Sequence, residues 1–196
     1  MAPIIHTVNL RKVYAVGKER VIALNDVSIS IENGEFCCIV GQSGSGKSTL
    51  LNQLAGLEKP TRGKVFIGSH EISAMTEDEL AKFRQAHLGF IFQSYNLLPT
   101  MTAAENVALP LMFKGISRSQ RLAMARALLH DSPIYVFDEA TSNVDAESEN
   151  DIMKAIHSLA GKKTVILISH RLANVVDSDC IYVLEAGRIA EQGTHN

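Results

Sequence analysis

The chain has 196 residues, of which 46% are hydrophobic and 20% charged, the composition of an ordinary globular protein rather than a disordered or fibrous one. Its formal net charge is −2 and its Lys and Arg residues are scattered, which argues against a nucleic-acid-binding protein. No signal-peptide pattern and no bilayer-length apolar run stands out, so we expect a chain that is neither secreted nor membrane-spanning by itself.

Strand and helix patterns follow one another along the first half of the chain. Val27, Ile29 and Ile31 alternate with polar residues, which predicts a half-exposed strand. Further along we expect strands at 35–40, 64–67 and 88–92, a helix at 48–55, and a helix that runs from a Thr76/Glu79 capping box to about residue 85.

The second half continues the alternation. We expect capping boxes at Thr102/Glu105 and Ser117/Gln120, strands at 134–137 and 164–168, a helix at 146–160, and a hairpin that pairs 180–184 with 188–191. Alternating strands and helices predict an α/β fold, with a mostly parallel sheet flanked by helices on both faces.

The three cysteines are Cys37, Cys38 and Cys180. An odd number without metal-ligand spacing predicts reduced, buried thiols in a cytosolic protein. Cys37 and Cys38 are neighbours in an apolar run, so on a strand their side chains point to opposite faces.

A glycine-rich segment follows the strand expected at 35–40. It reads Gly-Gln-Ser-Gly-Ser-Gly-Lys-Ser from Gly41 to Ser48 and matches the phosphate-binding loop pattern G-x-x-x-x-G-K-[ST]. Its glycines let backbone N–H groups approach phosphate oxygens, and the helix that follows adds its positive end. The alternative is a plain glycine turn, which the strand–loop–helix context disfavours. We therefore expect ATP-Mg here, with Lys47 on the phosphates and Ser48 on the metal.

Two carboxylates, Asp138 and Glu139, end the buried strand expected at 134–137. Asp138 would hold Mg²⁺ opposite Ser48, and Glu139 would polarise an attacking water. The alternative is an acidic pair that only caps the next turn.

Three further residues are candidates because of their position. Gln93 and His170 follow the strands expected at 88–92 and 164–168, at the sheet edge where folds of this kind place ligands. Tyr14 offers an aromatic ring that can stack on adenine. Each also has a simpler interpretation, as a loop residue for Gln93 and His170 and as a surface or core tyrosine for Tyr14.

Together these residues resemble the nucleotide-binding domain of ATP-binding cassette (ABC) transporters over nearly the whole chain. Gly41–Thr49 resembles the Walker A motif, 134–139 the Walker B motif with its catalytic glutamate, Gln93 the Q-loop, 142–145 the D-loop and His170 the switch histidine. The resemblance implies a P-loop NTPase (RecA-like) core with an antiparallel β portion on its N-terminal side.

The resemblance also assigns roles. It implies that Glu139, His170 and Gln93 are catalytic, that Ser48, Gln93 and Asp138 serve the Mg²⁺, and that Tyr14 stacks on the adenine. It implies that the nucleotide is bound by Tyr14, Gly41, Ser43, Gly44, Ser45, Gly46, Lys47, Ser48 and Thr49. In the family, a membrane permease is the partner at the cytoplasmic face, and two domains close head-to-tail over two ATP molecules.

The chain departs from the family pattern between Gln93 and the helix expected after residue 120. The family signature Leu-Ser-Gly-Gly-Gln and the multi-helix subdomain before it are missing, and 114–120 reads Lys-Gly-Ile-Ser-Arg-Ser-Gln. Residues up to about 119 resemble lipoprotein-releasing and macrolide-efflux cassettes, whereas 138–145 and 170–174 resemble exporter-type cassettes. Our hypothesis is a single domain over 1–196, joined near 114–121 in a recombinant or excised gene, and the alternative is a divergent natural cassette with a reduced helical lobe.

These features lead to two functional hypotheses. One is an ATPase motor subunit attached to a permease, and the other is a minimal cassette that binds nucleotide but is not a working motor. Because signature groups act on the phosphates in the transition state, we expect weak hydrolysis and a monomer. A P-loop kinase is a third possibility, which the matches at Gln93, Asp145 and His170 disfavour.

Overall fold

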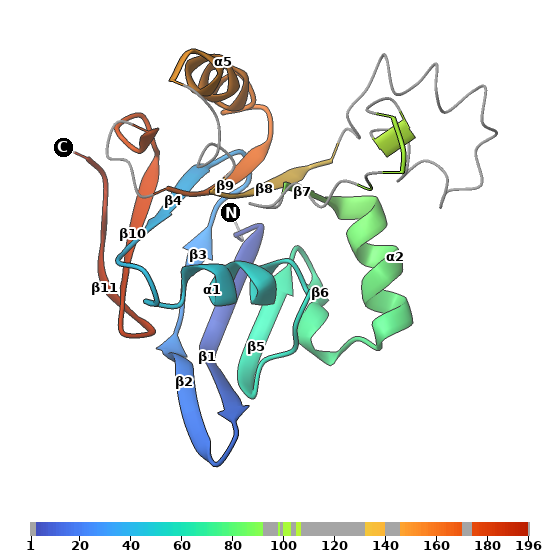
Figure 1. The fold of residues 1–196 in the computed structure, drawn as a ribbon, viewed down its shortest axis with the longest axis vertical. Coiled ribbons are helices and arrows are strands. Elements are labelled where there is room, and N and C mark those ends of the chain that lie inside the picture. Colours follow the sequence, from blue (N-terminus) through green and yellow to red (C-terminus); the bar gives the residue numbers. More distant parts are fainter. Residues whose placement is uncertain are drawn as a thin grey trace.

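The computed structural model describes residues 3–91, 98, 100–102, 105–106, 132–139, 146–169 and 174–195. Two sheets form the body of the described chain (Figure 1). The first is antiparallel, in the order β2 (Glu19–Val27), β1 (Ile5–Val16), β5 (Arg62–Ile67) and β6 (His70–Glu71), and β3 (Ser30–Ile31) also pairs with β1.

The second sheet has the order β11 (Arg188–Gly193), β10 (Cys180–Glu185), β4 (Phe36–Val40), β9 (Thr164–Ile168), β8 (Ile134–Asp138) and β7 (Leu88–Ile91). Each pair from β10 to β7 is parallel, and β11 joins β10 as an antiparallel hairpin. The predicted mostly parallel sheet is therefore confirmed, as is the antiparallel portion on the N-terminal side.

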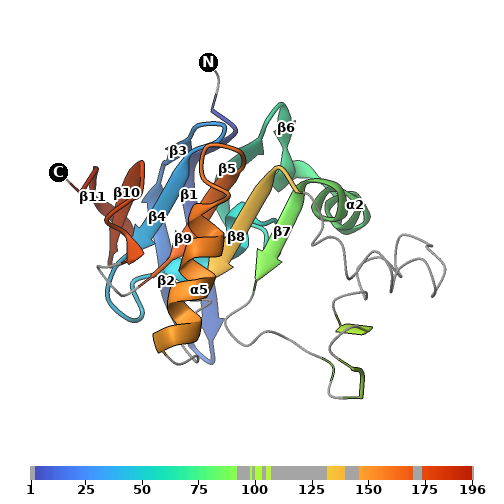
Figure 2. The ribbon, with the colours of Figure 1, turned by 90° about the horizontal axis from the view of Figure 1, so that it is seen from above.

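Helices lie on both faces of the parallel sheet. Helix α1 (Lys47–Leu54) packs between the two sheets, and α5 (Ala146–His157) covers the opposite face, as Figures 1 and 2 show. Helix α2 (Glu77–His87) follows a short 3₁₀ turn at Ile72–Ala74. None of the helices in the described ranges is long and apolar enough to cross a bilayer.

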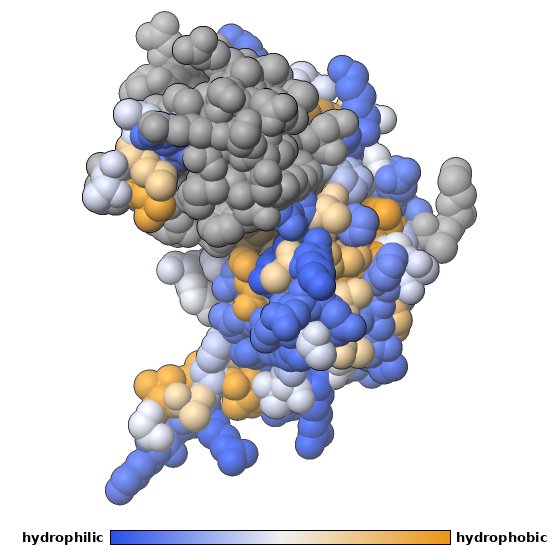
Figure 3. Space-filling model, turned by 90° about the vertical axis from the view of Figure 1, so that its right-hand side faces the viewer, coloured by the Kyte–Doolittle hydropathy of each residue, from blue (hydrophilic) through white to orange (hydrophobic). Residues whose placement is uncertain are grey.

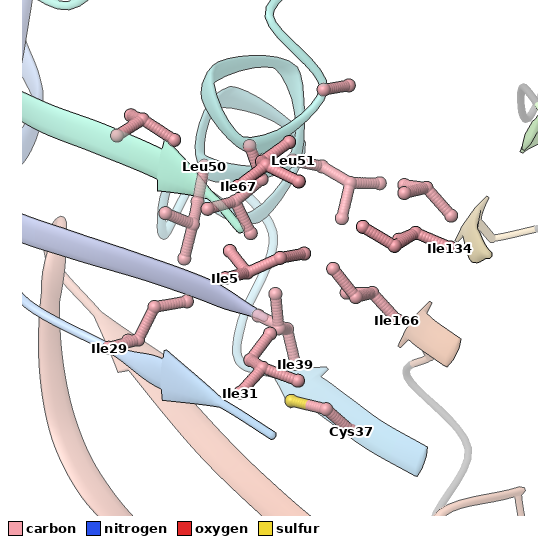
Figure 4. Packing of buried hydrophobic residues seen from close by; sticks show 14 of the residues in the cluster. Ile5, Ile29, Ile31, Cys37, Ile39, Leu50, Leu51, Ile67, Ile134 and Ile166 are labelled. Atoms are coloured by element: carbon pink, nitrogen blue, oxygen red, sulfur yellow. The ribbon is translucent and has the colours of Figure 1, made fainter. Parts of the chain in front are cut away.

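The parallel strands are apolar on both faces because each face is covered, and the core is accordingly split into two clusters. The cluster on the α1 side joins Leu50 and Leu51 to Ile39 and Cys37 (Figure 4). The cluster on the α5 side includes Cys38. The prediction that Cys37 and Cys38 point to opposite faces is confirmed.

The predicted strand at 27–32 is wrong as a single element. Strand β2 ends at Val27 and β3 begins at Ser30, because the side chain of Thr7 takes over the pairing between them. Thr7 Oγ1 donates to the Val27 carbonyl at 3.1 Å and accepts from the Ile29 N–H at 3.1 Å.

The hairpin of β1 and β2 was not predicted from the sequence. Its far end projects from the body, at the bottom of Figures 1 and 3, and carries the exposed side chains of Val16, Val21 and Ile22. The predicted junction at 114–121, and with it the reduced helical subdomain, lies outside the described residues.

Candidate functional site

The predicted phosphate loop connects β4 to α1, and its glycines have the left-handed backbone that the pattern requires. The φ angles of Gly41, Gly44 and Gly46 are 151°, 78° and 105°. A Cβ at Gly41 would overlap the Leu184 carbonyl oxygen, whereas at Gly44 nothing lies within 4 Å. The loop is thus pressed against β10 on one side and open on the other.

The side chain of Lys47 lies inside this loop and is 7% exposed. Its ammonium donates to the carbonyls of Gly41 and Gln42, each at 2.9 Å. The cation is therefore held against the loop backbone, where it adds positive charge to the N-terminal end of α1.

The carboxylate at the end of β8 faces the start of α1. Ser48 Oγ donates to Asp138 Oδ1 at 3.4 Å, across 90 residues of sequence. Burial, and then the charge of Glu139, raise the pKa of Asp138, while Ser48 and Lys47 oppose the rise. Glu139 has a φ of 46°, a left-handed conformation that is uncommon outside glycine. Two carboxylates close together on a half-buried strand end are a site that a cation stabilises.

The arrangement fits a bound nucleoside triphosphate with Mg²⁺. Ser45 Oγ is buried and has no hydrogen-bond partner among the described residues, so the loop contains a hydroxyl that phosphate oxygens can satisfy. The oxygens of Ser48 and Asp138 lie 3.4 Å apart, and Mg²⁺ typically takes one or two protein oxygens and completes its shell with phosphates and water.

Tyr14 lies on β1 and is tied to the loop side of the molecule. Its hydroxyl donates to Glu58 Oε2 at 2.7 Å, and it also hydrogen-bonds Thr49, the last residue of the loop. The Lys12 ammonium lies 5.2 Å from the centre of the ring and 3.1 Å from the same Glu58 oxygen. The aromatic ring is thus held in place beside the first turn of α1.

Comparisons with known proteins identify the family of the chain. The profile of the family described as "ABC transporter" matches residues 24–121. An ABC transporter ATP-binding protein of Thermotoga maritima is 36% identical over 96% of this chain and 94% of its own length. The chain belongs to the ABC transporter ATP-binding family.

Two further relatives support the same assignment to the cassette family. The lipoprotein-releasing system ATP-binding protein LolD of Saccharophagus degradans is 33% identical over 97% of this chain and 98% of its own length. The ATP-binding cassette MJ0796, from Methanocaldococcus jannaschii and solved as a dimer bound to ADP and Pi, has a TM-score of 0.89 at 33% identity and covers 98% of this chain and 99% of its own. The predicted P-loop NTPase fold is therefore confirmed.

Two predicted residues of the cassette, Gln93 and His170, lie outside the described residues. The strands before them can be placed: β7 ends at Ile91 and β9 ends at Ile168, and both flank β8. Asp138 ends β8 between them, so the three parallel strands end at one edge of the sheet.

Sequence reasoning missed the residues that support the cassette site from distant parts of the chain. Gly187 N–H donates to the Ser45 carbonyl at 2.9 Å, and Asn25 N–H donates to the Gly187 carbonyl at 2.8 Å. Glu58 and Lys12, which hold Tyr14 in place, were missed in the same way. No local pattern indicates these residues, because each acts through a contact formed only in the folded chain.

Proposed function

We propose that this chain binds ATP with Mg²⁺ as the nucleotide-binding subunit of a transporter, at the cytoplasmic face of a membrane. The observation that carries the proposal is the geometry of the loop Gly41–Thr49. The ammonium of Lys47 is folded into the loop, and the Ser48 hydroxyl at its end contacts the Asp138 carboxylate. The names of the relatives support ATP as the nucleotide.

The described side chains suggest a role for each residue of the site. The loop N–H groups and Lys47 bind the phosphates, Ser48 and Asp138 hold the Mg²⁺, and Glu139 polarises the attacking water. Tyr14 stacks on the adenine. Gln93 and His170 complete the site by resemblance, with Gln93 near the metal and His170 near the terminal phosphate.

We further propose that the chain lacks the signature motif and most of the helical subdomain. Two comparisons support this. The alignment with the Thermotoga maritima protein runs over 221 positions, more than the 196 residues of this chain, so it contains gaps in this chain. The family profile stops matching at residue 121, inside the proposed junction at 114–121. The different resemblances of the two halves favour a chimeric origin.

The missing segment predicts a weak enzyme. In the family the signature of one domain reaches the phosphates held by the other, so a pair without it lacks transition-state donors. Losing one such donor in an active site typically costs about 10²–10³ in rate. Loss of the subdomain would also remove surface that contacts the permease, so we propose a monomer that binds nucleotide without driving transport. A functional motor is the competing proposal, favoured by the intact Glu139.

Nucleotide titration calorimetry tests the binding site. Lys47→Ala removes charge-assisted hydrogen bonds of about 1.5–3 kcal/mol, so we expect ATP-Mg affinity to fall at least about tenfold. The matched control is Lys82→Ala, at an exposed lysine of α2, and it should leave the affinity unchanged. Equal affinity in both variants would contradict the proposed site.

Steady-state phosphate release separates the weak enzyme from the motor. We expect the native chain to release phosphate slowly and without cooperativity, because the transition-state donors of the signature are lacking, and we expect Glu139→Gln to release it no faster. Cooperative turnover in the native chain that Glu139→Gln abolishes would instead establish the motor.

A further inference from the structure

Two of the three cysteines face one another across neighbouring strands. Cys37 of β4 and Cys180 of β10 are directly paired positions of parallel strands. Both are free thiols in the same core cluster, on the α1 side of the sheet, where Figure 4 shows Cys37. Neither thiol has a role in the proposed nucleotide site.

The spacing of this pair suits a disulfide. Neighbouring strands lie about 4.7–4.9 Å apart, and bridged cysteines have Cα atoms about 4.4–6.8 Å apart. Directly paired residues of parallel strands project to the same face, and both side chains belong to the core cluster on the α1 side. The two sulfur atoms therefore lie side by side on one face of the sheet.

The surroundings of the two sulfurs make Cys180 the reactive one. Gln192 Nε2 lies 3.9 Å from Cys180 Sγ and points donor hydrogens at it. The neighbouring Cys37 thiol, aided by Gln192 and Tyr182 and opposed by burial and Glu35, lowers the pKa of Cys180. The neighbouring Cys180, with burial, raises the pKa of Cys37. Cys180 is also the more accessible, at 8% exposed against 0% for Cys37.

Cys38 lies next to this pair in sequence but on the other face of the sheet. It belongs to the cluster on the α5 side and accepts a hydrogen bond from Ser178 Oγ at 2.8 Å. Burial raises its pKa to about 12, so its thiolate is scarce at neutral pH. Cys38 is therefore an internal control, a cysteine of the same chain that we expect not to be oxidised.

We propose that Cys37 and Cys180 form an oxidisable dithiol, which hydrogen peroxide converts into a disulfide that joins β4 to β10. A peroxide is small enough to reach the thiol of a residue that is 8% exposed. The proposal assigns a modification site that is separate from nucleotide binding.

The reaction takes two steps. First, the Cys180 thiolate attacks one peroxide oxygen, the O–O bond breaks, and a sulfenic acid forms on Cys180, while the departing hydroxide becomes water by taking up the proton that the Cys180 thiol released on ionisation. Next, the Cys37 sulfur attacks the Cys180 sulfur, the S–O bond breaks, and the hydroxyl leaves as water with the Cys37 proton. The two thiols lose two electrons, the peroxide gains them, and two waters form.

The experiment counts and maps thiols after oxidation of the folded chain. The reduced native chain is treated with hydrogen peroxide, denatured, alkylated and examined by mass spectrometry with peptide mapping. We expect alkylation to fall from three thiols to one, with the remaining label on Cys38 and full recovery after a thiol reductant. Cys38→Ala should still form the bond.

The single variants of the pair test the order of the steps. Cys37→Ala should stop at a sulfenic acid on Cys180, which dimedone traps, whereas Cys180→Ala should show neither the disulfide nor the trapped acid. Three alkylatable thiols in the oxidised native chain, or a disulfide that includes Cys38, would overturn the proposal. The peptide map of the oxidised native chain can by itself support or overturn the proposal. The test therefore does not depend on whether every variant folds.

Discussion

The carboxyl group of Asp138 lies at the end of β8, and its surroundings disfavour its charged form. It is half-buried, Glu139 follows it directly, and the ammonium of Lys47 is turned into the loop. Burial raises the pKa of its carboxyl group, and the charge of Glu139 raises it further. In the proposed site a Mg²⁺ would offset the electrostatic free-energy cost of the charged Asp138 carboxylate. This cost therefore favours binding of the metal.

This raised pKa has a consequence for stability that depends on pH. Between the ordinary carboxyl pKa of 3.8 and the raised value, the folded chain binds more protons at Asp138 than the unfolded chain, so stability falls as pH rises through that window. Asp138→Asn removes the penalty, and without metal we expect the variant to be more stable at pH 7, by less than about 1 kcal/mol because solvent screens a half-buried group.

Urea unfolding at pH 7 and below pH 3.8, each without metal, measures the difference. The gain should vanish at the lower pH, where Asp138 is protonated in both states. Adding ATP-Mg at pH 7 should reverse the order, since only the native chain retains the proposed metal ligand. A gain that grows on acidification would contradict the assigned cause.

At the scale of elements, the phosphate loop is shaped by the strand behind it. Gly41 and Gly44 both have positive φ, but only a Cβ at Gly41 would meet backbone, the Leu184 carbonyl of β10. Gly44→Ala should therefore cost only the left-handed backbone, about 1–2 kcal/mol. Gly41→Ala adds a clash with a carbonyl that cannot move without β10, and we expect a loss above about 4 kcal/mol.

Chemical unfolding of the two variants without nucleotide measures both losses, and the clash with backbone is the contribution that only Gly41→Ala carries. Equal losses of unfolding free energy would mean that β10 moves away from the added methyl group at no cost. The close approach of the Leu184 carbonyl would then contribute nothing to the difference in stability.

Elements with a local signature were predicted well. Strand β9 has the predicted bounds, and the capping box of α2 is complete, with Glu79 N–H donating to Thr76 Oγ1 at 3.4 Å and Thr76 N–H donating to Glu79 Oε2 at 2.8 Å. The glycine spacing of Gly41–Thr49 and the buried strand end at Asp138 are local patterns too, and the structure brings the two together through Ser48. Their part in nucleotide binding stays a prediction.

Strand β1 was missed for the opposite reason. Its pairing with β2 shifts register on either side of Lys12, and its pairing with β5 shifts between Val8 and Arg11, so its side chains do not alternate cleanly. The partners of the site, such as Glu58 for Tyr14, were missed because they depend on that pairing and on contacts distant in sequence.

At the scale of the whole molecule, the proposed loss of the signature decides how copies associate. The relative MJ0796 was solved as a dimer bound to ADP and Pi. In a head-to-tail pair each signature binds the nucleotide of the other copy, so chains without it gain no shared phosphate contacts. We therefore expect this chain to stay monomeric when nucleotide binds.

Light scattering coupled to size exclusion, in ATP-Mg and with Glu139→Gln to block turnover, measures the mass. The expected result is the mass of one chain both with and without nucleotide. A dimer that appears only with ATP-Mg would contradict the monomer and restore the motor proposal.

The turn of the β10–β11 hairpin has a consequence for how the protein is made. Gly187 hydrogen-bonds Ser45 of the phosphate loop and Asn25 of the antiparallel sheet, so the loop is completed by residues that come late in the chain. A nascent chain grows at about 5–20 residues per second, so a segment made early must wait for a partner that is made later. A chain still attached to the ribosome, with β10 not yet made, carries every residue of the loop but not the strand that shapes it. The proposed nucleotide site thus takes its final shape only after this hairpin has been made and β10 has paired with β4.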